Sequence, residues 1–172
     1  MIKKLKYIDE VIESLNKQFP DSIISMGQEI KFSGEIIKTG ASNLDEALGI
    51  GGIPCGRVIE VFGQEAVGKT SMALHIAAEF QKKQNNNGDC QVALYVDAEH
   101  GLDPKYAKAI GVNVEHLILT QANCGEEILN IASKLIKTGE VGLVILDSVP
   151  ALVPRAELEN DIGDSTIALQ AR

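Results

Sequence analysis

The sequence has few cysteines and none of the spacings in which cysteines usually build a structure. The three present are scattered, odd in number and never spaced as C-x-x-C: Cys55, Cys90 and Cys124. This argues against both a disulfide framework and a zinc site. No apolar run approaches the roughly 20 residues of a membrane-spanning helix. The charged start MIKKLKYIDEVIESL does not resemble a secretory signal, so we expect a soluble, cytoplasmic protein without a membrane partner.

Positive charge is also scarce. The chain has 24 acidic residues against 16 Lys and Arg, which gives a net charge of -8. Such a balance argues against indiscriminate nucleic-acid binding over the whole surface but leaves a local DNA site open. With 172 residues, of which 45% are apolar, the chain is large enough to bury the core of one ordinary domain with a small appendage.

Apolar residues at three- and four-residue steps predict an amphipathic helix over residues 2 to about 18. Pro20 and Asp21 end it, and a polar stretch with several glycines, residues 27–40, indicates a boundary. We therefore predict an N-terminal helical arm of residues 1–33 and a core of residues 34–172. The residues alone leave two placements open for the arm, either on its own domain or on a neighbouring subunit.

After Arg57, short apolar runs alternate with helical segments, a pattern typical of an α/β fold with a mostly parallel sheet flanked by helices. The predicted strands are residues 57–62, 91–96, 116–120 and 142–147, and the predicted helices are 69–83, 103–110 and 125–137. Each strand is almost wholly apolar, as expected when helices cover both faces of the sheet. Such sheets bind ligands at the carboxyl ends of their strands.

The segment GQEAVGKTS follows the first predicted strand and opens the first core helix. It satisfies G-x-x-x-x-G-K-[ST], the phosphate-loop pattern, in the structural context that this pattern requires. Glycine lets the backbone point its N–H groups at phosphate oxygens, at the positive end of a helix. Lys69 is expected to reach the β- and γ-phosphates, and Thr70 to offer its hydroxyl to Mg²⁺. The residues predicted to contact the nucleotide are Gly63, Gln64, Glu65, Ala66, Val67, Gly68, Lys69, Thr70 and Ser71.

Acidic residues at two other strand ends complete a hydrolytic site. Asp147 closes the run GLVILD and is predicted to hold Mg²⁺ together with Thr70. Glu99 lies just past the run QVALYVD, where its carboxylate is placed to polarise the attacking water. Asp97, two residues earlier, is a competing candidate for this base. The residues therefore predict magnesium-dependent hydrolysis of a nucleoside triphosphate.

Four long segments, in the same order, resemble the bacterial RecA recombinase family. They are TGASNLDEALGIGGIPCGR (39–57), GQEAVGKTS (63–71), DAEHGLDPKYA (97–107) and LDSVPALVPRAELENDIGDS (146–165). The resemblance extends from the first helix to the last residue and implies a RecA-like P-loop ATPase fold. It further implies a filament on single-stranded DNA with ATP between protomers, pairing with duplex DNA, and strand exchange. The family also promotes self-cleavage of a repressor in the SOS response to DNA damage.

The same resemblance assigns roles to particular residues. It makes Glu99, rather than Asp97, the catalytic carboxylate, acting together with Lys69. Asp103 and Tyr106 match positions that flank the adenine, and Tyr106 would stack on the base. The N-terminal helix becomes an oligomerisation arm that packs on the adjacent protomer. The stretch VPRAELENDIGDS resembles the first DNA-binding loop, and the implied DNA contacts are Glu157, Asn160, Gly163, Ile167 and Arg172.

The chain covers about half of the family's length, so we expect the ATPase core to be incomplete at its C-terminal end. In the family, a strand absent here lies between the strand that leads into Gly63 and the strand that ends in Asp147. Without it, we expect this polypeptide alone to be weakly folded or inactive in strand exchange. Two alternatives are another RecA-fold ATPase, such as a ring helicase, and a non-catalytic nucleotide-binding fragment that caps the filaments of an intact partner.

Overall fold

The computed structural model describes residues 6–19, 34–84, 88–121 and 124–155. The chain divides into two compact units, residues 1–33 and 34–172. The first unit contributes α1 (Lys6–Gln18), so the predicted N-terminal helix is present within the described residues. Its role as an oligomerisation arm stays a prediction. In the part of the chain that the structure describes, no helix is both long enough and apolar enough to cross a membrane.

The second unit is built on a parallel sheet of three strands in the order β4-β3-β5. These strands are β3 (Val92–Asp97), β4 (Leu117–Thr120) and β5 (Val141–Asp147), each within a residue or so of its predicted range. Pairing between β3 and β5 places Asp97 opposite Asp147. This register brings the carboxyl ends of two neighbouring strands to one edge of the sheet, where a ligand site is expected.

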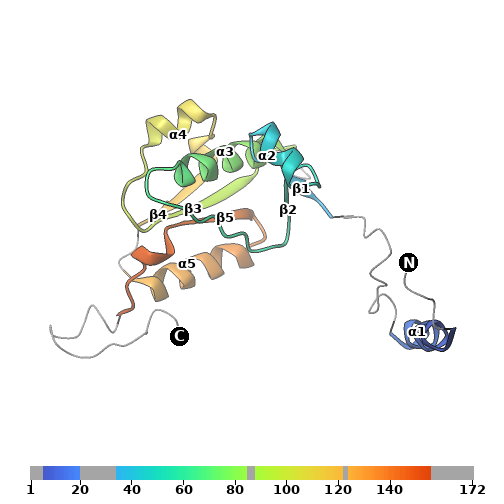
Figure 1. The fold of residues 1–172 in the computed structure, drawn as a ribbon. Helices are drawn as coiled ribbons and strands as arrows, with labels where there is room; N and C mark the ends of the chain where they lie inside the picture. The colour runs from blue at the N-terminus through green and yellow to red at the C-terminus, as the bar shows by residue number, and fades with distance from the viewer. Residues whose placement is uncertain (1–5, 20–33, 85–87, 122–123, 156–172) are drawn as a thin grey trace. The chain divides into compact units, whose positions relative to one another are not determined.

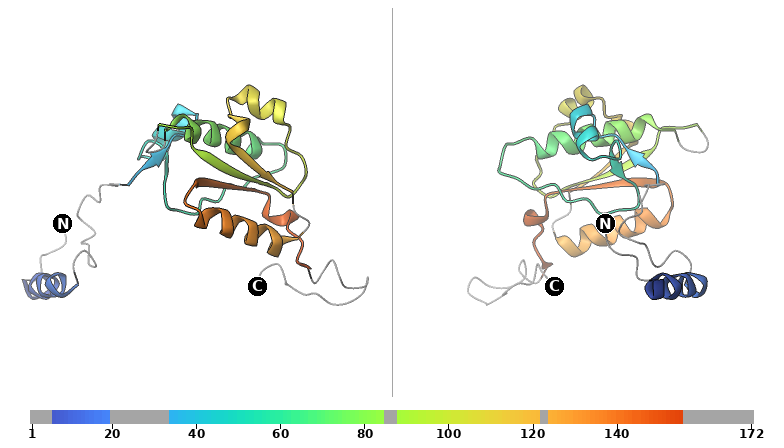
Figure 2. Two further views of the ribbon diagram at one scale, coloured as in Figure 1. Left: turned by 180° about the vertical axis from the view of Figure 1, so that it is seen from behind. Right: turned by 45° about the vertical axis from the view of Figure 1, so that its right-hand side comes forward.

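Helices cover both faces of this sheet (Figure 1). The helices α3 (Lys69–Lys82) and α4 (Pro104–Ile110) lie on one face, and α5 (Gly125–Lys137) lies on the other, as both views in Figure 2 also show. Within β3, Tyr95 packs toward α3, whereas Leu94 packs toward α5. Because successive side chains point to opposite faces and both faces are covered, the strand is almost wholly apolar up to Asp97 at its end.

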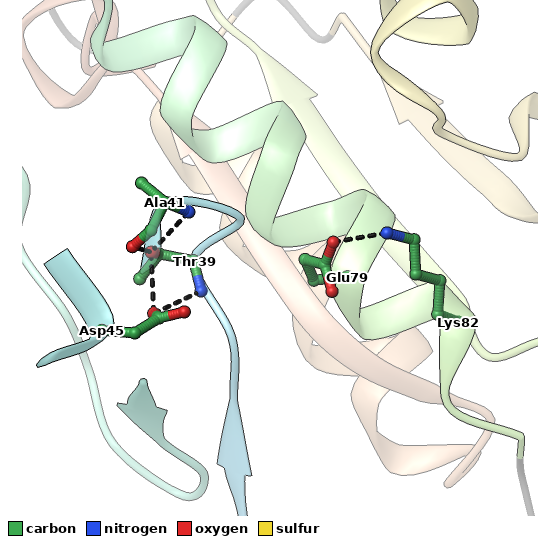
Figure 3. A network of polar contacts seen from close by, with 5 residues as sticks. All are labelled: Thr39, Ala41, Asp45, Glu79 and Lys82. Atoms are coloured by element: carbon green, nitrogen blue, oxygen red, sulfur yellow. Dashed lines mark hydrogen bonds and ion pairs between the residues drawn. The ribbon is translucent and has the colours of Figure 1, made fainter. Parts of the chain in front are cut away.

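Residues 34–56 form small elements that the sequence did not predict. Strands β1 (Ile36–Ile37) and β2 (Ile53–Pro54) pair antiparallel, and α2 (Ser42–Ala47) lies between them in the chain. The buried Thr39 fixes the turn, because its N–H and hydroxyl both donate to Asp45 Oδ1, at 2.9 and 2.8 Å (Figure 3). Two short 3₁₀ helices, η1 (Val114–His116) and η2 (Val149–Ala151), precede β4 and follow β5.

The prediction of a strand over residues 57–62 is wrong. This segment is irregular between β2 and the phosphate loop, and Val58 and Phe62 are 101% and 86% exposed. A strand needs a neighbour that takes up its backbone hydrogen bonds. No described segment pairs with residues 57–62, and β5 has a described partner, β3, on one side only.

Candidate nucleotide site

The predicted phosphate loop connects this irregular segment to the N-terminus of α3. Gly68 caps α3 with a φ of 96°, a left-handed conformation that glycine adopts without strain. Residues 63–68 are all exposed. The first N–H groups of a helix have no acceptor within the helix, so this terminus carries partial positive charge. The loop and helix therefore offer an accessible anion site.

Lys69, the first residue of α3, folds back over the loop. Its Nζ atom donates hydrogen bonds to the carbonyl oxygens of Gly63, at 3.1 Å, and Gln64, at 2.8 Å. These two contacts hold the ammonium group above the turn that the loop makes. The positive charge of Lys69 is thus held at the start of the loop, and the N-terminus of α3 adds partial positive charge at its end.

Thr70 links the phosphate loop to the end of β5. Its hydroxyl donates to Asp147 Oδ2 at 2.6 Å, although the two residues are 77 positions apart in the chain. Hydroxyl and carboxylate oxygens are ligands that Mg²⁺ prefers, usually together with several waters. Among the described residues, no group of three or more His, Cys, Asp or Glu forms a metal cage. Thr70 and Asp147 together supply two oxygen atoms of the kind that Mg²⁺ prefers.

Tyr95 also reaches this carboxylate, and the sequence reasoning missed it. Its hydroxyl donates to Asp147 Oδ2 at 2.7 Å. Burial raises the pKa of Tyr95 far above its usual range, and its hydrogen bond to Asp147 raises it further, so the phenol stays a neutral donor. The available signal was a polar aromatic residue within the otherwise apolar run VALYV, since a buried tyrosine hydroxyl usually has a partner.

Glu99 lies beside the end of β5, as its proposed role requires. Ser148 follows Asp147 directly, and its hydroxyl donates to Glu99 Oε1 at 2.5 Å. Glu99 is exposed, which leaves its carboxylate accessible to water. Ser148 is a second residue that the sequence reasoning missed. Its one signal was its position next to an acid at a strand end.

Asp97, the competing candidate for the base, is 3% exposed and engaged by donors. It accepts hydrogen bonds from the N–H groups of Gly101 and Leu102, each at 3.0 Å, and from Gln121 Nε2 at 2.9 Å. Burial by itself raises the pKa of Asp97, but these hydrogen bonds hold it below its ordinary value. Asp97 therefore fastens the loop that carries Glu99, which favours Glu99 as the base.

Of the two residues expected near the adenine, Tyr106 lies beside the start of α3. Asp103 caps α4 by accepting a hydrogen bond from the N–H of Lys105 at 2.8 Å. Tyr106 is 46% exposed, and its hydroxyl is 2.8 Å from Ser71 Oγ. An exposed aromatic ring is thus held next to the phosphate loop. Its stacking role stays a prediction, and the predicted DNA contacts, Glu157, Asn160, Gly163, Ile167 and Arg172, lie outside the described residues.

Comparison with known proteins identifies the family. The family model of the RecA N-terminal domain matches residues 6–172 of this chain. Protein RecA of Clostridium botulinum (strain Alaska E43 / Type E3) is 48% identical over 172 residues, which cover 99% of this chain and 47% of that protein. Protein RecA of Gluconobacter oxydans is 46% identical over 170 residues, which cover 98% and 48% of the two chains. The chain spans about half the length of these relatives, and it belongs to the RecA family, whose α/β fold it has.

Proposed function

We propose that this chain supplies the nucleotide-binding core of an ATP-dependent DNA recombinase. The observation that carries the proposal is the 2.6 Å hydrogen bond from Thr70 to Asp147. It joins the phosphate loop to the strand end at which Ser148 holds Glu99. Phosphoryl transfer needs a site for the phosphates, ligands for a metal ion and a base for the attacking water. The phosphate loop, the pair of Thr70 and Asp147, and Glu99 are the candidates for these parts, and these contacts bring them close to one edge of the sheet.

Each of these residues has a distinct task in the proposed reaction. The N–H groups of the loop and of the first turn of α3 bind the phosphate oxygens, and Lys69 neutralises the β- and γ-phosphates. Thr70 and Asp147 hold Mg²⁺, which supplies positive charge to the phosphates when bound. Glu99 orients the attacking water and takes up its proton. Tyr106 stacks on the adenine.

Family membership supports a proposal for the function of the whole protein. We infer that single-stranded DNA stimulates the hydrolysis, that protomers assemble into a filament with ATP between them, and that the filament pairs homologous DNA and exchanges strands. In this proposal the protein acts in the cytoplasm, in DNA repair and the SOS response, where it also promotes self-cleavage of a repressor. The N-terminal helical arm would contact the adjacent protomer.

Equilibrium binding of a fluorescent ATP analogue tests the nucleotide site. We expect saturable binding that requires Mg²⁺. Glu99→Gln should bind as tightly as the wild type, because the amide keeps the size of the side chain, but it should release no phosphate in a coupled hydrolysis assay. Lys82→Ala, at the far end of α3, is the matched control and should change neither property. Absence of nucleotide binding by the folded wild-type chain would overturn the proposal.

A non-catalytic, filament-capping role is the second candidate. It is favoured by the exposed segment 57–62 and by β5, for which the described residues supply one partner strand. Titration of the chain into filaments of a full-length RecA protein on single-stranded DNA separates the two roles. Shortening of filaments at low ratios of chain to full-length protein supports capping. Unchanged filament length, together with DNA-stimulated hydrolysis by the chain, supports the recombinase role.

A further inference from the structure

The hydroxyl of Tyr95 is a polar group placed within an apolar cluster. Tyr95 is 1% exposed and packs with Leu74, Ala77, Ala107 and Val112 between β3 and the helices on its α3 face. A buried hydroxyl without a partner is costly, so a phenylalanine would serve packing alone equally well. The hydroxyl is satisfied by one contact, its 2.7 Å hydrogen bond to Asp147 Oδ2.

The strand register explains how the phenol reaches that carboxylate. Tyr95 lies opposite Ile145 on β5, and Asp147 follows two residues later, so these side chains point to the same face of the sheet. Side chains in strands lean along the strand direction. The long tyrosine side chain therefore extends from within the cluster to the carboxyl end of the neighbouring strand.

Two hydroxyls converge on one oxygen of Asp147. Thr70 donates to Oδ2 from α3, at 2.6 Å, and Tyr95 donates to the same atom from β3. Together they fix the rotation of the carboxylate, and Oδ1 is the oxygen that neither hydroxyl addresses. Thr70 sits on a helix terminus beside an exposed loop, whereas Tyr95 is anchored in the core. Tyr95 is therefore the more deeply buried of the two supports.

We propose that Tyr95 is a positioning residue for the metal site: its buried hydroxyl holds the Asp147 carboxylate in the orientation that receives a divalent cation beside Thr70. This inference rests on the proposed function, because it concerns the same magnesium–nucleotide site. Groups that orient a metal ligand from behind typically change metal affinity about 10- to 100-fold when they are removed.

The test separates metal binding from nucleotide binding. The wild-type chain, Tyr95→Phe and Val112→Ala are titrated with fluorescent ADP, first in EDTA and then with increasing Mn²⁺, whose bound fraction is read by electron paramagnetic resonance. We expect Tyr95→Phe to bind ADP in EDTA as the wild type does and to bind Mn²⁺ about tenfold more weakly. Val112→Ala removes methyl groups from the same cluster and should keep the wild-type Mn²⁺ affinity. Affinities are expressed per folded molecule, as measured by circular dichroism.

A double variant tests whether the hydroxyl acts through Asp147. If it does, Tyr95→Phe combined with Asp147→Asn should bind Mn²⁺ no more weakly than Asp147→Asn alone. Wild-type Mn²⁺ affinity in Tyr95→Phe would overturn the inference, as would an equal loss of ADP affinity with and without the metal, which indicates a purely structural role. If the wild-type chain itself binds no Mn²⁺ with ADP, the proposed function fails first, and the two failures are thereby distinguished.

Discussion

Two apolar segments of this molecule have similar composition, but one is a buried strand and the other is exposed and irregular. The strand β3 pairs on both sides, and its residues 93–97 are buried. Residues 57–62, with the sequence RVIEVF, are exposed along their whole length and form no strand. The difference lies in the neighbours: β3 has β4 and β5 beside it and helices on both faces, whereas the described residues provide residues 57–62 with no pairing strand.

This comparison bears directly on the candidate site. The carboxylates of Asp147 and Asp97 are held at the ends of paired strands, so their positions follow from the sheet register. The phosphate loop instead follows the unpaired segment 57–62. Its position relative to β5 depends on α3 and on the hydrogen bond between Thr70 and Asp147. The phosphate loop, whose residues 63–68 are all exposed, is therefore the part of the candidate site that the sheet holds in place least.

Truncation of a buried side chain in β3 should have the largest effect on stability. Leu94 is 0% exposed and packs against α5. Leu94→Ala should lower the free energy of unfolding by about 2–5 kcal/mol, through lost burial and a residual cavity. Chemical denaturation monitored by circular dichroism measures this change. A loss below about 1 kcal/mol would contradict the buried, paired state of β3.

Lys69→Ala should weaken binding of the fluorescent ATP analogue roughly 10- to 100-fold, because a hydrogen bond to a charged group contributes about 1.5–3 kcal/mol. Lys82→Ala is the control on the same helix, because Lys82 pairs with Glu79 on the surface (Figure 3) and exposed pairs contribute little. Equal affinities for the two variants would show that the phosphates bind elsewhere.

Asp97→Asn should destabilise the protein by about 1–3 kcal/mol at neutral pH, because an amide accepts the three hydrogen bonds less well than a carboxylate does. The effect should depend on pH. Because the folded state lowers the pKa of Asp97 from its ordinary value of 3.8, the unfolded chain takes up the proton first as the pH falls. The stabilisation is therefore present at neutral pH and is lost in acid below that value.

Denaturation curves at several acidic pH values check the sign of this effect. The wild type should lose stability more steeply than Asp97→Asn as the pH falls below 3.8. Parallel pH profiles for the two proteins would mean that Asp97 titrates in the folded state as it does in the unfolded chain.

The smallest effect is expected in the unpaired segment. Val58 is 101% exposed, so Val58→Ala should change the free energy of unfolding by no more than about 0.5 kcal/mol. Its contrast with Leu94→Ala sharpens the comparison between the two apolar segments, since both substitutions shorten an aliphatic side chain. A loss of about 2 kcal/mol or more in Val58→Ala would show that residues 57–62 are packed after all.

Much of the fold could be predicted from the sequence, because periodicity reports burial. The runs that became β3, β4 and β5 were apolar on both faces, and the helix over residues 125–137 was predicted at its observed bounds. The prediction failed at residues 57–62, because an apolar run shows that a strand is possible but not whether a neighbouring strand is available. The β1–β2 pair was missed because each strand has two residues, too few to show a period.

Part of the candidate site could be predicted from local sequence patterns. The spacing of its glycines and Lys69 predicts the phosphate loop, and acids at the ends of predicted strands indicate Asp147 and Glu99, whose catalytic roles stay predictions. The contacts of Tyr95 with Asp147 and of Ser148 with Glu99 could not be predicted, because they depend on which strands are neighbours and in what register. The preference for Glu99 over Asp97 as the base also depends on the fold, because the sequence does not show which donors surround the Asp97 carboxylate.

A crystal structure of the chain with Mg²⁺ and a non-hydrolysable ATP analogue tests the central claim most directly. That claim is that the phosphate loop and the ends of β3 and β5 form one magnesium–nucleotide site. The account predicts the triphosphate over residues 63–70, the ion between Thr70 and Asp147, and Glu99 facing the terminal phosphate. A nucleotide bound away from the loop, or bound there with Asp147 and Glu99 turned to other surfaces, would contradict it.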